Sequence, residues 1–244
     1  MEVNEIYQGD TLELLRQLPD NSVDLIITSP PYNLTGFNGV HKRNSRHNWD
    51  TNIAYSGTTD LDNMPEEEYE KNQIEVLNEC YRVLKPLGSM FYNHKIRVRQ
   101  QQISHPLEWI SKSKFRCRQE IIWDRLRTHN INGCRYLPTT ERIYWLCKGK
   151  KNPLFKRQSS MTEVWTINYS KSPEHPAPFP IEIPDHIIPH IKAAYPRNYK
   201  ITVLDPYCGT GTVCVSAKKH GCNWLGFDIV QEYVDMSRNR LNNI

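Results

Sequence analysis

The sequence predicts an α/β fold in which helices cover both faces of a mostly parallel sheet. Two mostly apolar runs, within residues 23–27 and 200–205, lack the polar alternation of half-exposed strands and are typical of strands buried on both faces. The second run leads into a glycine loop and then a helix, a Rossmann-like order of elements. The length of 244 residues suits one domain, so we expect residues 1–244 to form a single unit.

The charge of the chain is clustered rather than large. Lys and Arg number 31 against 27 Asp and Glu, which gives a net charge of +4. The basic residues gather in four stretches, 41–47, 95–99, 112–118 and 148–157. Clusters of this kind indicate a polyanionic partner such as nucleic acid.

Cysteine usage and hydropathy predict a cytoplasmic protein. The seven cysteines are an odd number and include no Cys-x-x-Cys motif, so we expect free thiols in a reducing compartment. No basic and apolar leader opens the chain, and no apolar run approaches the ~18 residues that cross a membrane. We therefore expect neither secretion nor a membrane partner.

The N-terminal segment predicts a strand at 2–8 and a helix at 11–18. Gly9 and Asp10 separate the two elements. Asp10 precedes the helix and Glu13 follows three residues later, which is the pattern of a capping box. This local role for Asp10 leaves room for a ligand contact as well.

The next strand ends at Thr28 and leads into Ser29-Pro30-Pro31-Tyr32. The two prolines have no N–H and fix φ, so the chain leaves the sheet in a rigid extended turn whose carbonyls are free. A planar substrate with an amino group fits such a turn, because a carbonyl and the Ser29 hydroxyl accept from the amine and the Tyr32 ring stacks on the π-face. The alternative is a turn that only ends the strand.

Residues 33–62 lack periodicity and are rich in Gly, Asn, Ser and basic side chains. A loop of this length in a compact domain is usually functional or disordered. We expect a flexible arm that closes over nucleic acid, with Lys42, Arg43 and Arg46 as contacts. An ordinary solvated loop is the alternative.

The middle of the chain predicts alternating helices and strands. A helix begins at Pro65, with Ile74, Leu77, Tyr81 and Leu84 as its buried stripe, and it ends at 85–88. The elements that follow are a strand at 89–93, a helix at 105–113, a strand at 116–124, a strand at 141–147 and a helix at 181–194 that Pro184 and Pro189 should break or kink. Trp123, Tyr144 and Trp145 are expected in the core.

Residues 148–175 are basic and poor in apolar side chains. They form either a small insert for target recognition or an excursion over the surface. We expect Lys150 and Lys151 to contact nucleic acid.

The glycine loop predicts an adenosyl ligand. Strand 200–205 runs into Pro206-Tyr207-Cys208-Gly209-Thr210-Gly211-Thr212 and a helix at 213–220. Cys214 stands where a dinucleotide motif has its third glycine, which favours an adenosyl group without a pyrophosphate. The next strand, 222–227, ends in Asp228, which lies 19 residues after Gly209, close to the spacing at which an acid meets ribose hydroxyls.

Together, the Ser29-Pro30-Pro31-Tyr32 motif and the motif from Asp205 to Thr212 resemble the S-adenosylmethionine-dependent DNA amino-methyltransferases. The Pro-Pro motif precedes the glycine motif, which resembles the β class of that family. Tyr207 departs from the usual Phe of the family. The resemblance implies a Rossmann-like, seven-stranded, circularly permuted sheet with strand 200–205 at its centre. Strand 23–28 would then lie on one side of it, strand 222–228 on the other, and the N-terminal strand beyond.

The resemblance also implies the site. Ser29, Pro30, Pro31 and Tyr32 would be catalytic. The cofactor S-adenosylmethionine would be held, without a metal, by Asp10, Thr28, Phe179, Asp205, Pro206, Tyr207, Cys208, Gly209, Thr210, Gly211, Thr212 and Asp228. Asp228 would accept from the ribose and Asp10 would contact the adenine amine. No Pro-Cys pair supplies the thiolate of a ring-carbon methyltransferase.

The family comparison implies a substrate and partners. Double-stranded DNA with a flipped base is the expected substrate, and a homodimer and a cognate restriction endonuclease are candidate partners. Ser before Pro-Pro favours N4 of cytosine, with N6 of adenine as the alternative. RNA or protein-amide methyltransferases with Asn-Pro-Pro-Tyr are a different class, but in the protein enzymes the glycine motif precedes the Pro-Pro motif. An inactive DNA-binding partner subunit is the non-enzymatic alternative, against which the intact motifs count.

Overall fold

The computed structural model describes residues 1–33, 64–99, 101–128, 133–157, 161–168 and 179–244. Almost all of the predicted loop 33–62, with Lys42, Arg43 and Arg46, lies outside the described residues. The predicted insert 148–175 is described only in part.

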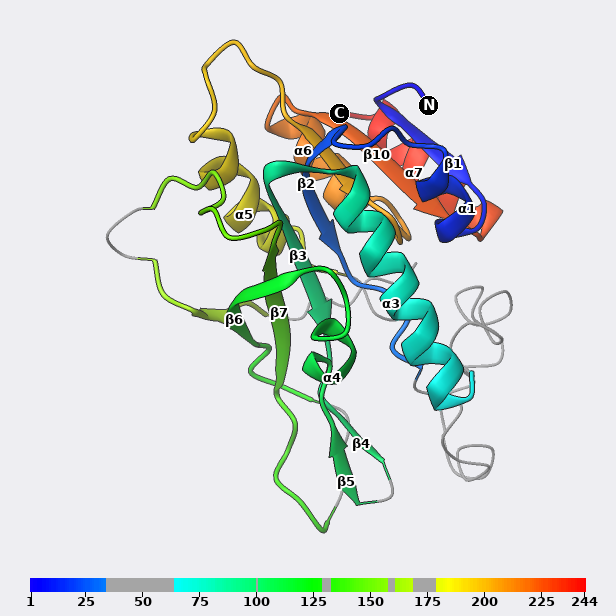
Figure 1. Cartoon of the computed structure of the whole chain (residues 1–244), viewed down its shortest axis with the longest axis vertical. Helices are drawn as coiled ribbons and strands as arrows, with labels where there is room; N and C mark the ends of the chain where they lie inside the picture. Colours follow the sequence, from blue (N-terminus) through cyan, green and yellow to red (C-terminus); the bar gives the residue numbers. More distant parts are fainter. Residues whose placement is uncertain (34–63, 100, 129–132, 158–160, 169–178) are drawn as a thin grey trace.

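An eight-stranded sheet forms the centre of the molecule (Figure 1). From edge to edge its strands are β1 (Glu5–Gln8), β10 (Asn223–Asp228), β9 (Thr202–Asp205), β2 (Val23–Thr28), β3 (Leu84–His94), β7 (Thr140–Cys147), β6 (Arg116–Asp124) and β8 (Val164–Thr166). The first five strands are parallel, whereas β7 is antiparallel to β3 and β6. The predicted mostly parallel sheet is confirmed, but it has one strand more than the seven expected, because the three-residue β8 adds parallel to β6.

The predicted strand order around the glycine motif is also confirmed. Strand β9 lies between β2 and β10, and β1 lies beyond β10. The loops that follow β1, β10, β9, β2 and β3 therefore emerge at one edge of the sheet, where ligands bind in such folds. The circular permutation relative to other methyltransferases stays a prediction.

Helices cover both faces of the sheet, and the sheet separates the core into two layers. They are α1 (Thr11–Arg16), α3 (Glu66–Val83), α4 (Leu107–Ile110), α5 (Glu182–Lys192), α6 (Thr212–Lys219) and α7 (Gln231–Asn242). One layer holds the apolar side chains of α1, α3 and α4, and the other holds those of α5, α6 and α7. Figure 1 shows α3 on the near side of the sheet and α6 on the far side. In the described ranges no helix is both long and apolar enough to cross a membrane.

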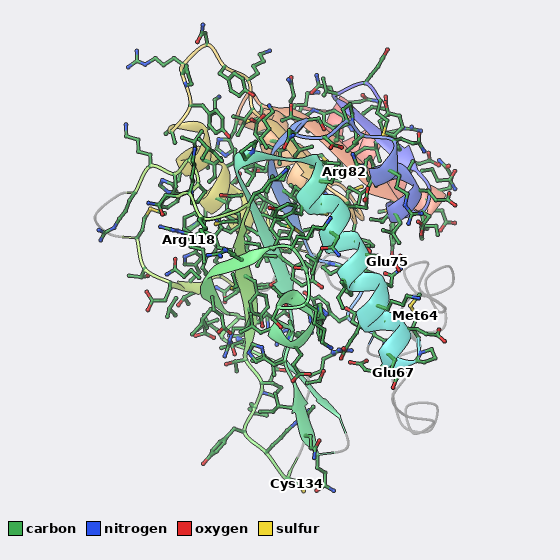
Figure 2. The ribbon with its side chains drawn as sticks, in the orientation of Figure 1. Met64, Glu67, Glu75, Arg82, Arg118 and Cys134 are labelled. Carbon is green, nitrogen blue, oxygen red and sulfur yellow. The ribbon has the colours of Figure 1, made fainter. Side chains whose placement is uncertain are left out.

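Two residues of the predicted buried stripe, Leu77 and Leu84, are buried, but the rest of the buried face of α3 is shifted by one residue. Its buried residues are Tyr69, Gln73, Val76, Leu77, Cys80 and Val83, while Ile74 and Tyr81 are only partly buried. At its C-terminal end, Arg82 donates to the carbonyls of Leu15 (2.8 Å) and Leu18 (2.8 Å) and so ties α3 to α1 (Figure 2). The docking of α3 against α1 selects the buried face, because an i, i+3, i+4 pattern can be assigned in two neighbouring registers.

Strand β3 begins earlier than predicted. Residues 84–88, expected to end the helix, instead continue into the sheet, with Leu84 opposite Val23. The pairing shifts register between Val23 and Leu25, and such an irregularity tolerates Pro86, which cannot donate to a ladder. A Cβ at Gly88 would lie 2.7 Å from the backbone oxygen of Asp24, so the close approach of β3 to β2 requires glycine there.

The predicted helix at 181–194 is confirmed as α5, and its prolines do not break it; a kink, the other expected outcome, stays a prediction. The helix runs unbroken from Glu182 to Lys192. Pro184 stands in the first turn, where a backbone N–H has no helical acceptor, and Pro189 removes one helical hydrogen bond. The predicted helix at 105–113 is only the four-residue α4. The predicted core aromatics are buried, as are five of the seven cysteines, and all seven thiols are free.

A hairpin of β4 (Arg97–Arg99) and β5 (Gln102–Ser104) projects beyond the carboxyl end of β3 (Figure 1). The guanidinium of Arg97 lies 4.9 Å from the ring centre of Tyr69 and 5.1 Å from that of Trp109. Its Nη1 donates to the carbonyl of Tyr32 (3.2 Å). The hairpin therefore anchors the Pro-Pro loop through Arg97.

Candidate active site

The two loops that the sequence places at opposite ends of the chain meet at one edge of the sheet. Strands β2 and β9 are parallel neighbours, with Ile26 opposite Leu204. At their carboxyl ends the buried Thr28 hydroxyl donates to the buried Asp205 carboxylate at 2.8 Å. This hydrogen bond fixes the Ser-Pro-Pro-Tyr loop beside the glycine loop.

The glycine loop is held in a conformation that only glycine fits. Gly211 has φ of 79°, in the left-handed region, and a Cβ there would lie 2.9 Å from both Cβ and Oγ of Ser237 on α7. Ser237 donates to the carbonyl of Gly209 at 2.7 Å. Helix α7 therefore packs directly under the loop, which leaves the backbone of Gly209 and Gly211 able to approach a ligand closely.

Asp228 and the start of α1 close around the same loop. The amide of Gly209 donates to Oδ2 of Asp228 at 2.9 Å, and the amide of Gly9 donates to its carbonyl at 3.0 Å. The Thr11 hydroxyl donates to the carbonyl of Pro206 at 2.7 Å. These bonds bring the N-terminal loop, the glycine loop and the end of β10 together, as the ribose and adenine roles of Asp228 and Asp10 require.

Asp10 caps α1, as predicted, but among the described residues no bond from the Asp10 amide to the Glu13 side chain completes the capping box. Its Oδ1 accepts from the amides of Leu12 (2.9 Å) and Glu13 (3.1 Å). Its Oδ2 accepts no hydrogen bond from the residues that the structure describes, so the cap leaves one oxygen available. Burial raises the pKa of Asp228, although backbone amides oppose the shift.

Asp205 is a buried carboxyl group with an unusual acidity. It accepts from Thr28 and from the amide of Tyr207 (3.1 Å). Burial nevertheless raises its pKa to about 7, and the Asp228 carboxylate contributes to the rise. A cationic ligand beside Asp205 would favour its ionised form.

The other predicted cofactor residues support the loop. Arg240 of α7 donates through Nη1 to the carbonyl of Thr210 (2.6 Å) and to the hydroxyl of Thr212 (3.3 Å). Cys208 is buried, and its amide donates to the carbonyl of Phe227 at 2.8 Å. Phe179 is partly buried against the core layer of α5, α6 and α7. Whether these side chains contact the cofactor stays a prediction.

The Ser-Pro-Pro-Tyr motif, predicted to be catalytic, has a hydrogen-bond network that the sequence did not reveal. The hydroxyl oxygens of Ser29 and Tyr32 lie 2.7 Å apart. Tyr32 donates to Oε2 of Glu141 at 3.1 Å, and Nδ2 of Asn93 donates to both Tyr32 (2.6 Å) and Glu141 (3.0 Å). The only signal in the sequence was position, since Asn93 lies near the end of one strand and Glu141 near the start of an antiparallel one.

Two of the three carbonyls at residues 30–32 accept hydrogen bonds within the protein. The carbonyl of Pro31 accepts from the Tyr69 hydroxyl at 2.8 Å, and that of Tyr32 accepts from Arg97. Within the described part of the chain, no hydrogen bond reaches the carbonyl of Pro30. This carbonyl is the predicted acceptor for the amine.

The Tyr32 ring lies beside the ring of His94 and the ammonium group of Lys95. Its centre is 4.6 Å from that of His94, with the planes tilted by 44°, and the ammonium of Lys95 lies 5.6 Å from it. Burial first, and the Glu141 carboxylate second, raise the pKa of Tyr32 well above its ordinary value. The side chain therefore keeps its proton at neutral pH.

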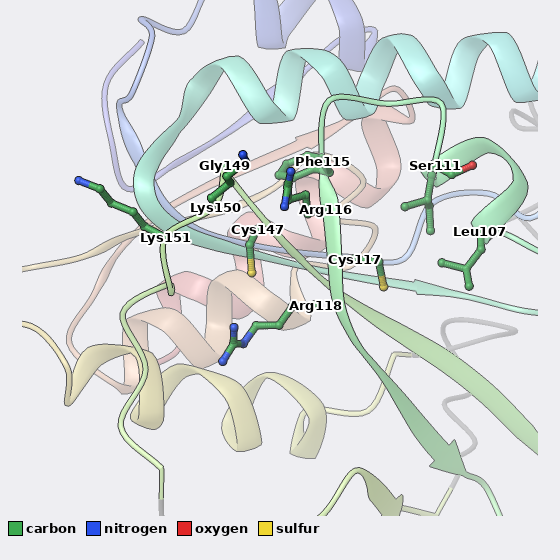
Figure 3. Close-up of a pocket in the computed structure, with 11 residues that line it drawn as sticks. Leu107, Ser111, Phe115, Arg116, Cys117, Arg118, Cys147, Gly149, Lys150 and Lys151 are labelled. Atoms are coloured by element: carbon green, nitrogen blue, oxygen red, sulfur yellow. The ribbon is translucent and has the colours of Figure 1, made fainter.

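Lys150 and Lys151 lie near the amino ends of the parallel strands, whereas Ser29 lies at their carboxyl ends. Lys148, just before them, donates to the carbonyl of Leu84, the first residue of β3, at 2.7 Å. The structure therefore does not bring these predicted DNA contacts together with the catalytic loop. They line a cavity of about 590 Å³ (Figure 3), together with Leu107, Ile110, Ser111, Phe115, Arg116, Cys117, Arg118, Cys147 and Gly149.

The fold and the site define the class of this protein before any comparison. A parallel sheet that joins a glycine loop and a Ser-Pro-Pro-Tyr loop at one edge is typical of a methyltransferase. The model of the family described as DNA methylase (N6_N4_Mtase) matches residues 23–239, and the chain belongs to this family.

Individual relatives agree with this assignment. The type II methyltransferase M.BglII of Bacillus subtilis is 28% identical over 274 residues, covering 96% of this chain and 68% of the relative. M.HinfI of Haemophilus influenzae is 26% identical over 261 residues, covering 99% and 69%.

Solved structures share the fold. The cytosine-N4-specific PvuII DNA methyltransferase superposes with a TM-score of 0.75 at 21% identity, covering 98% of this chain and 87% of that one. The M1.HpyAVI–SAM complex gives a TM-score of 0.65 at 20% identity, covering 98% of both chains. Among the described residues, no group of His, Cys, Asp and Glu side chains could hold a metal ion.

Proposed function

We propose that this protein transfers a methyl group from S-adenosylmethionine to the exocyclic amino group of a base flipped out of double-stranded DNA, with N4 of cytosine as the target. The meeting of the two loops, fixed by the bond between Thr28 and Asp205, carries the proposal. The names of the relatives support DNA as the substrate, and the SAM complex among the structural neighbours supports the cofactor.

The residues of the glycine loop fit this cofactor. The amino group and sulfonium of S-adenosylmethionine are cationic, and Asp205 would supply a carboxylate for them. Asp228 supplies a second carboxylate for the ribose hydroxyls, and Asp10 has a free oxygen for the adenine amine. The left-handed Gly211 fixes the shape of the loop against α7. When bound, the cofactor supplies an electrophilic methyl group.

The chain itself orients the acceptor nitrogen. The lone pair of an exocyclic amine is delocalised into the ring, which makes it a poor nucleophile. Hydrogen bonds from the amine to the carbonyl of Pro30 and to Oγ of Ser29 would draw the nitrogen toward tetrahedral geometry and aim its lone pair at the methyl group. Orientation and preorganised electrostatics then lower the barrier without a covalent intermediate.

Flipping the base must be offset by other contacts. Unpairing and unstacking cost a few kcal/mol, and stacking on Tyr32 returns roughly 1–3 kcal/mol. We propose that phosphate contacts from Lys42, Arg43 and Arg46, which lie outside the described residues, supply the remainder.

Cytosine is proposed over adenine because Ser29 precedes the two prolines, and the cytosine-N4-specific structural neighbour agrees. The test is transfer of labelled methyl groups to DNA, followed by mass spectrometry of the nucleosides, with RNA and protein as control acceptors. We expect N4-methylcytosine. N6-methyladenine would reassign the base, and the absence of transfer from the intact protein would refute the proposal in favour of an inactive partner subunit.

The partners follow from this function. Because the named relatives are type II methyltransferases, we propose that the chain modifies DNA alongside a cognate restriction endonuclease in the cytoplasm. A homodimer stays a prediction, and light scattering of the purified protein would test it.

A further inference from the structure

From the network behind the catalytic motif, we infer that Glu141 is a positioning residue that makes the Ser29 hydroxyl a hydrogen-bond acceptor toward the target amine. The inference rests on the proposed function, because it concerns how the same site holds the amine. Glu141 does not touch the substrate in this account and acts through Tyr32.

The direction of the hydroxyl chain follows from counting protons. Tyr32 has one hydroxyl proton, which it donates to Oε2 of Glu141. The short contact of 2.7 Å between Tyr32 and Ser29 must then use the proton of Ser29. Ser29 Oγ is left with lone pairs and no proton to offer, so it can only accept from a substrate N–H.

The surroundings of Glu141 hold its carboxylate in place. Its side chain is 6% exposed, and its Oε1 lies 3.0 Å from Nη1 of Arg125 and 3.3 Å from Nζ of Lys95. The other oxygen, Oε2, faces Tyr32 and Asn93. The cations thus hold one oxygen and leave the second as the end acceptor of the hydroxyl chain.

Asn93 also favours proton donation from Ser29 to Tyr32 and from Tyr32 to Glu141. It is 1% exposed, and its Nδ2 donates to Glu141 and to Tyr32. A weaker contact of 3.3 Å reaches Ser29 Oγ. Because a carboxylate accepts and never donates when ionised, it forces the NH₂ side of the amide toward the hydroxyls.

The hydroxyl chain from Ser29 through Tyr32 to Glu141 also provides a route for the proton that the reaction releases. Methyl transfer forms an N–C bond, breaks the S–C bond of the donor and leaves one proton too many on the nitrogen. That proton passes to Oγ of Ser29 while Ser29 gives its own to Tyr32 and Tyr32 gives its own to Glu141. The resulting carboxylic acid loses the proton to water beside Lys95, whose side chain is 32% exposed.

Glu141→Gln tests this inference with almost no change of shape. The amide oxygen of the glutamine should face Arg125 and Lys95, which only donate, so its NH₂ group should face Tyr32. Tyr32 would then receive a proton instead of giving one, and Ser29 would become a donor. We expect the single-turnover rate of methyl transfer to fall at least about tenfold, with unchanged affinity for S-adenosylmethionine and for DNA.

The second variant, Tyr32→Phe, keeps the ring for stacking and removes the link. It should lower the rate by a similar factor at unchanged affinities. The double variant should be no slower than Tyr32→Phe alone, because Glu141 acts through the missing hydroxyl. As a matched control, Glu120→Gln on the neighbouring strand β6 removes a carboxylate that pairs with Arg142 at 2.8 Å and should leave the rate unchanged.

Three outcomes would overturn the inference while leaving the proposed function intact. They are a wild-type rate in Glu141→Gln, a wild-type rate in Tyr32→Phe, and losses in the two single variants that multiply in the double variant. If Glu141→Gln does not fold, judged by its melting temperature, Tyr32→Phe alone decides. Absence of methyl transfer in the unmodified protein would instead count against the proposed function.

Discussion

The raised pKa of Asp205 predicts that cofactor affinity depends steeply on pH. Without ligand, burial holds this pKa at about 7, so the carboxyl group is mostly protonated below neutrality. The cationic amino group and sulfonium of S-adenosylmethionine favour the ionised form. Binding must therefore release the proton, and affinity should rise with pH until Asp205 is already ionised.

The size of the effect follows from the fraction ionised before binding. With a pKa of about 7, this fraction is about 3% at pH 5.5 and about 75% at pH 7.5, so the affinity should rise about 25-fold over this range. The window ends at pH 7.5 because an α-amino group such as that of the ligand titrates near ~8. The Asp205→Asn variant, which has no proton to lose, should bind more weakly and with little dependence on pH.

The free energy of unfolding of the ligand-free protein should fall, rather than rise, with pH. Because the pKa of Asp205 is higher in the folded than in the unfolded chain, the folded state binds more protons between about pH 4 and pH 7. Its contribution to the free energy of unfolding is therefore present at low pH and is lost as the pH rises through about 7. Asp205→Asn should remove this part of the pH dependence.

Isothermal titration calorimetry in buffers of different ionisation enthalpy measures both the affinity and the number of protons released. Near pH 6 we expect close to one proton per cofactor bound. A dissociation constant that does not change between pH 5.5 and 7.5, or an equal slope in Asp205→Asn, would show that this carboxyl group does not face the cationic part of the ligand.

Three further predictions test the loops and the basic cavity. Tyr32→Ala should lose methyl transfer far more than cofactor affinity, and equal losses of both would contradict a stacking role. Gly211→Ala should lower the free energy of unfolding by about 2–4 kcal/mol, from left-handed strain and overlap with α7, whereas Gly133→Ala, with open space around it, should change little in thermal melts. The double variant Lys150→Ala/Lys151→Ala should leave the salt dependence of binding to a short duplex unchanged; a slope lower by about 2 would show that both lysines contact phosphate after all.

The sequence was sufficient for the parallel half of the fold. The runs that become β2 and β9 are apolar on both faces, and a strand of that kind has few alternatives to the middle of a parallel sheet. The positions of the glycine loop and of Asp228 in the fold could also be predicted from the sequence, because a left-handed backbone and an acid at a fixed spacing restrict the residue type at each position. Asp10 was predicted as a helix cap, and the structure confirms it.

The errors arose where local patterns admit more than one structure. Lys85 to Gly88 resembled a helix end, yet pairing with β2 draws these residues into β3. Pro184 and Pro189 indicated a break or a kink in α5. The helix is not broken, because the first turn needs no N–H from Pro184 and packing of the helix outweighs the single hydrogen bond lost at Pro189. Propensity is a weak prior, and tertiary packing overrides it.

The sequence by itself predicted which two loops meet at the candidate site, because each motif restricts its own backbone and follows an apolar run typical of a buried strand. The tertiary structure alone decided which side chains complete it. Glu141 lies 109 positions from Tyr32 along the chain, and only the antiparallel pairing of β7 with β3 brings its carboxylate to that hydroxyl. The same pairing carries Lys150 and Lys151 away from the site, since an antiparallel strand begins beside the carboxyl end of its neighbour β3 and ends beside the amino end.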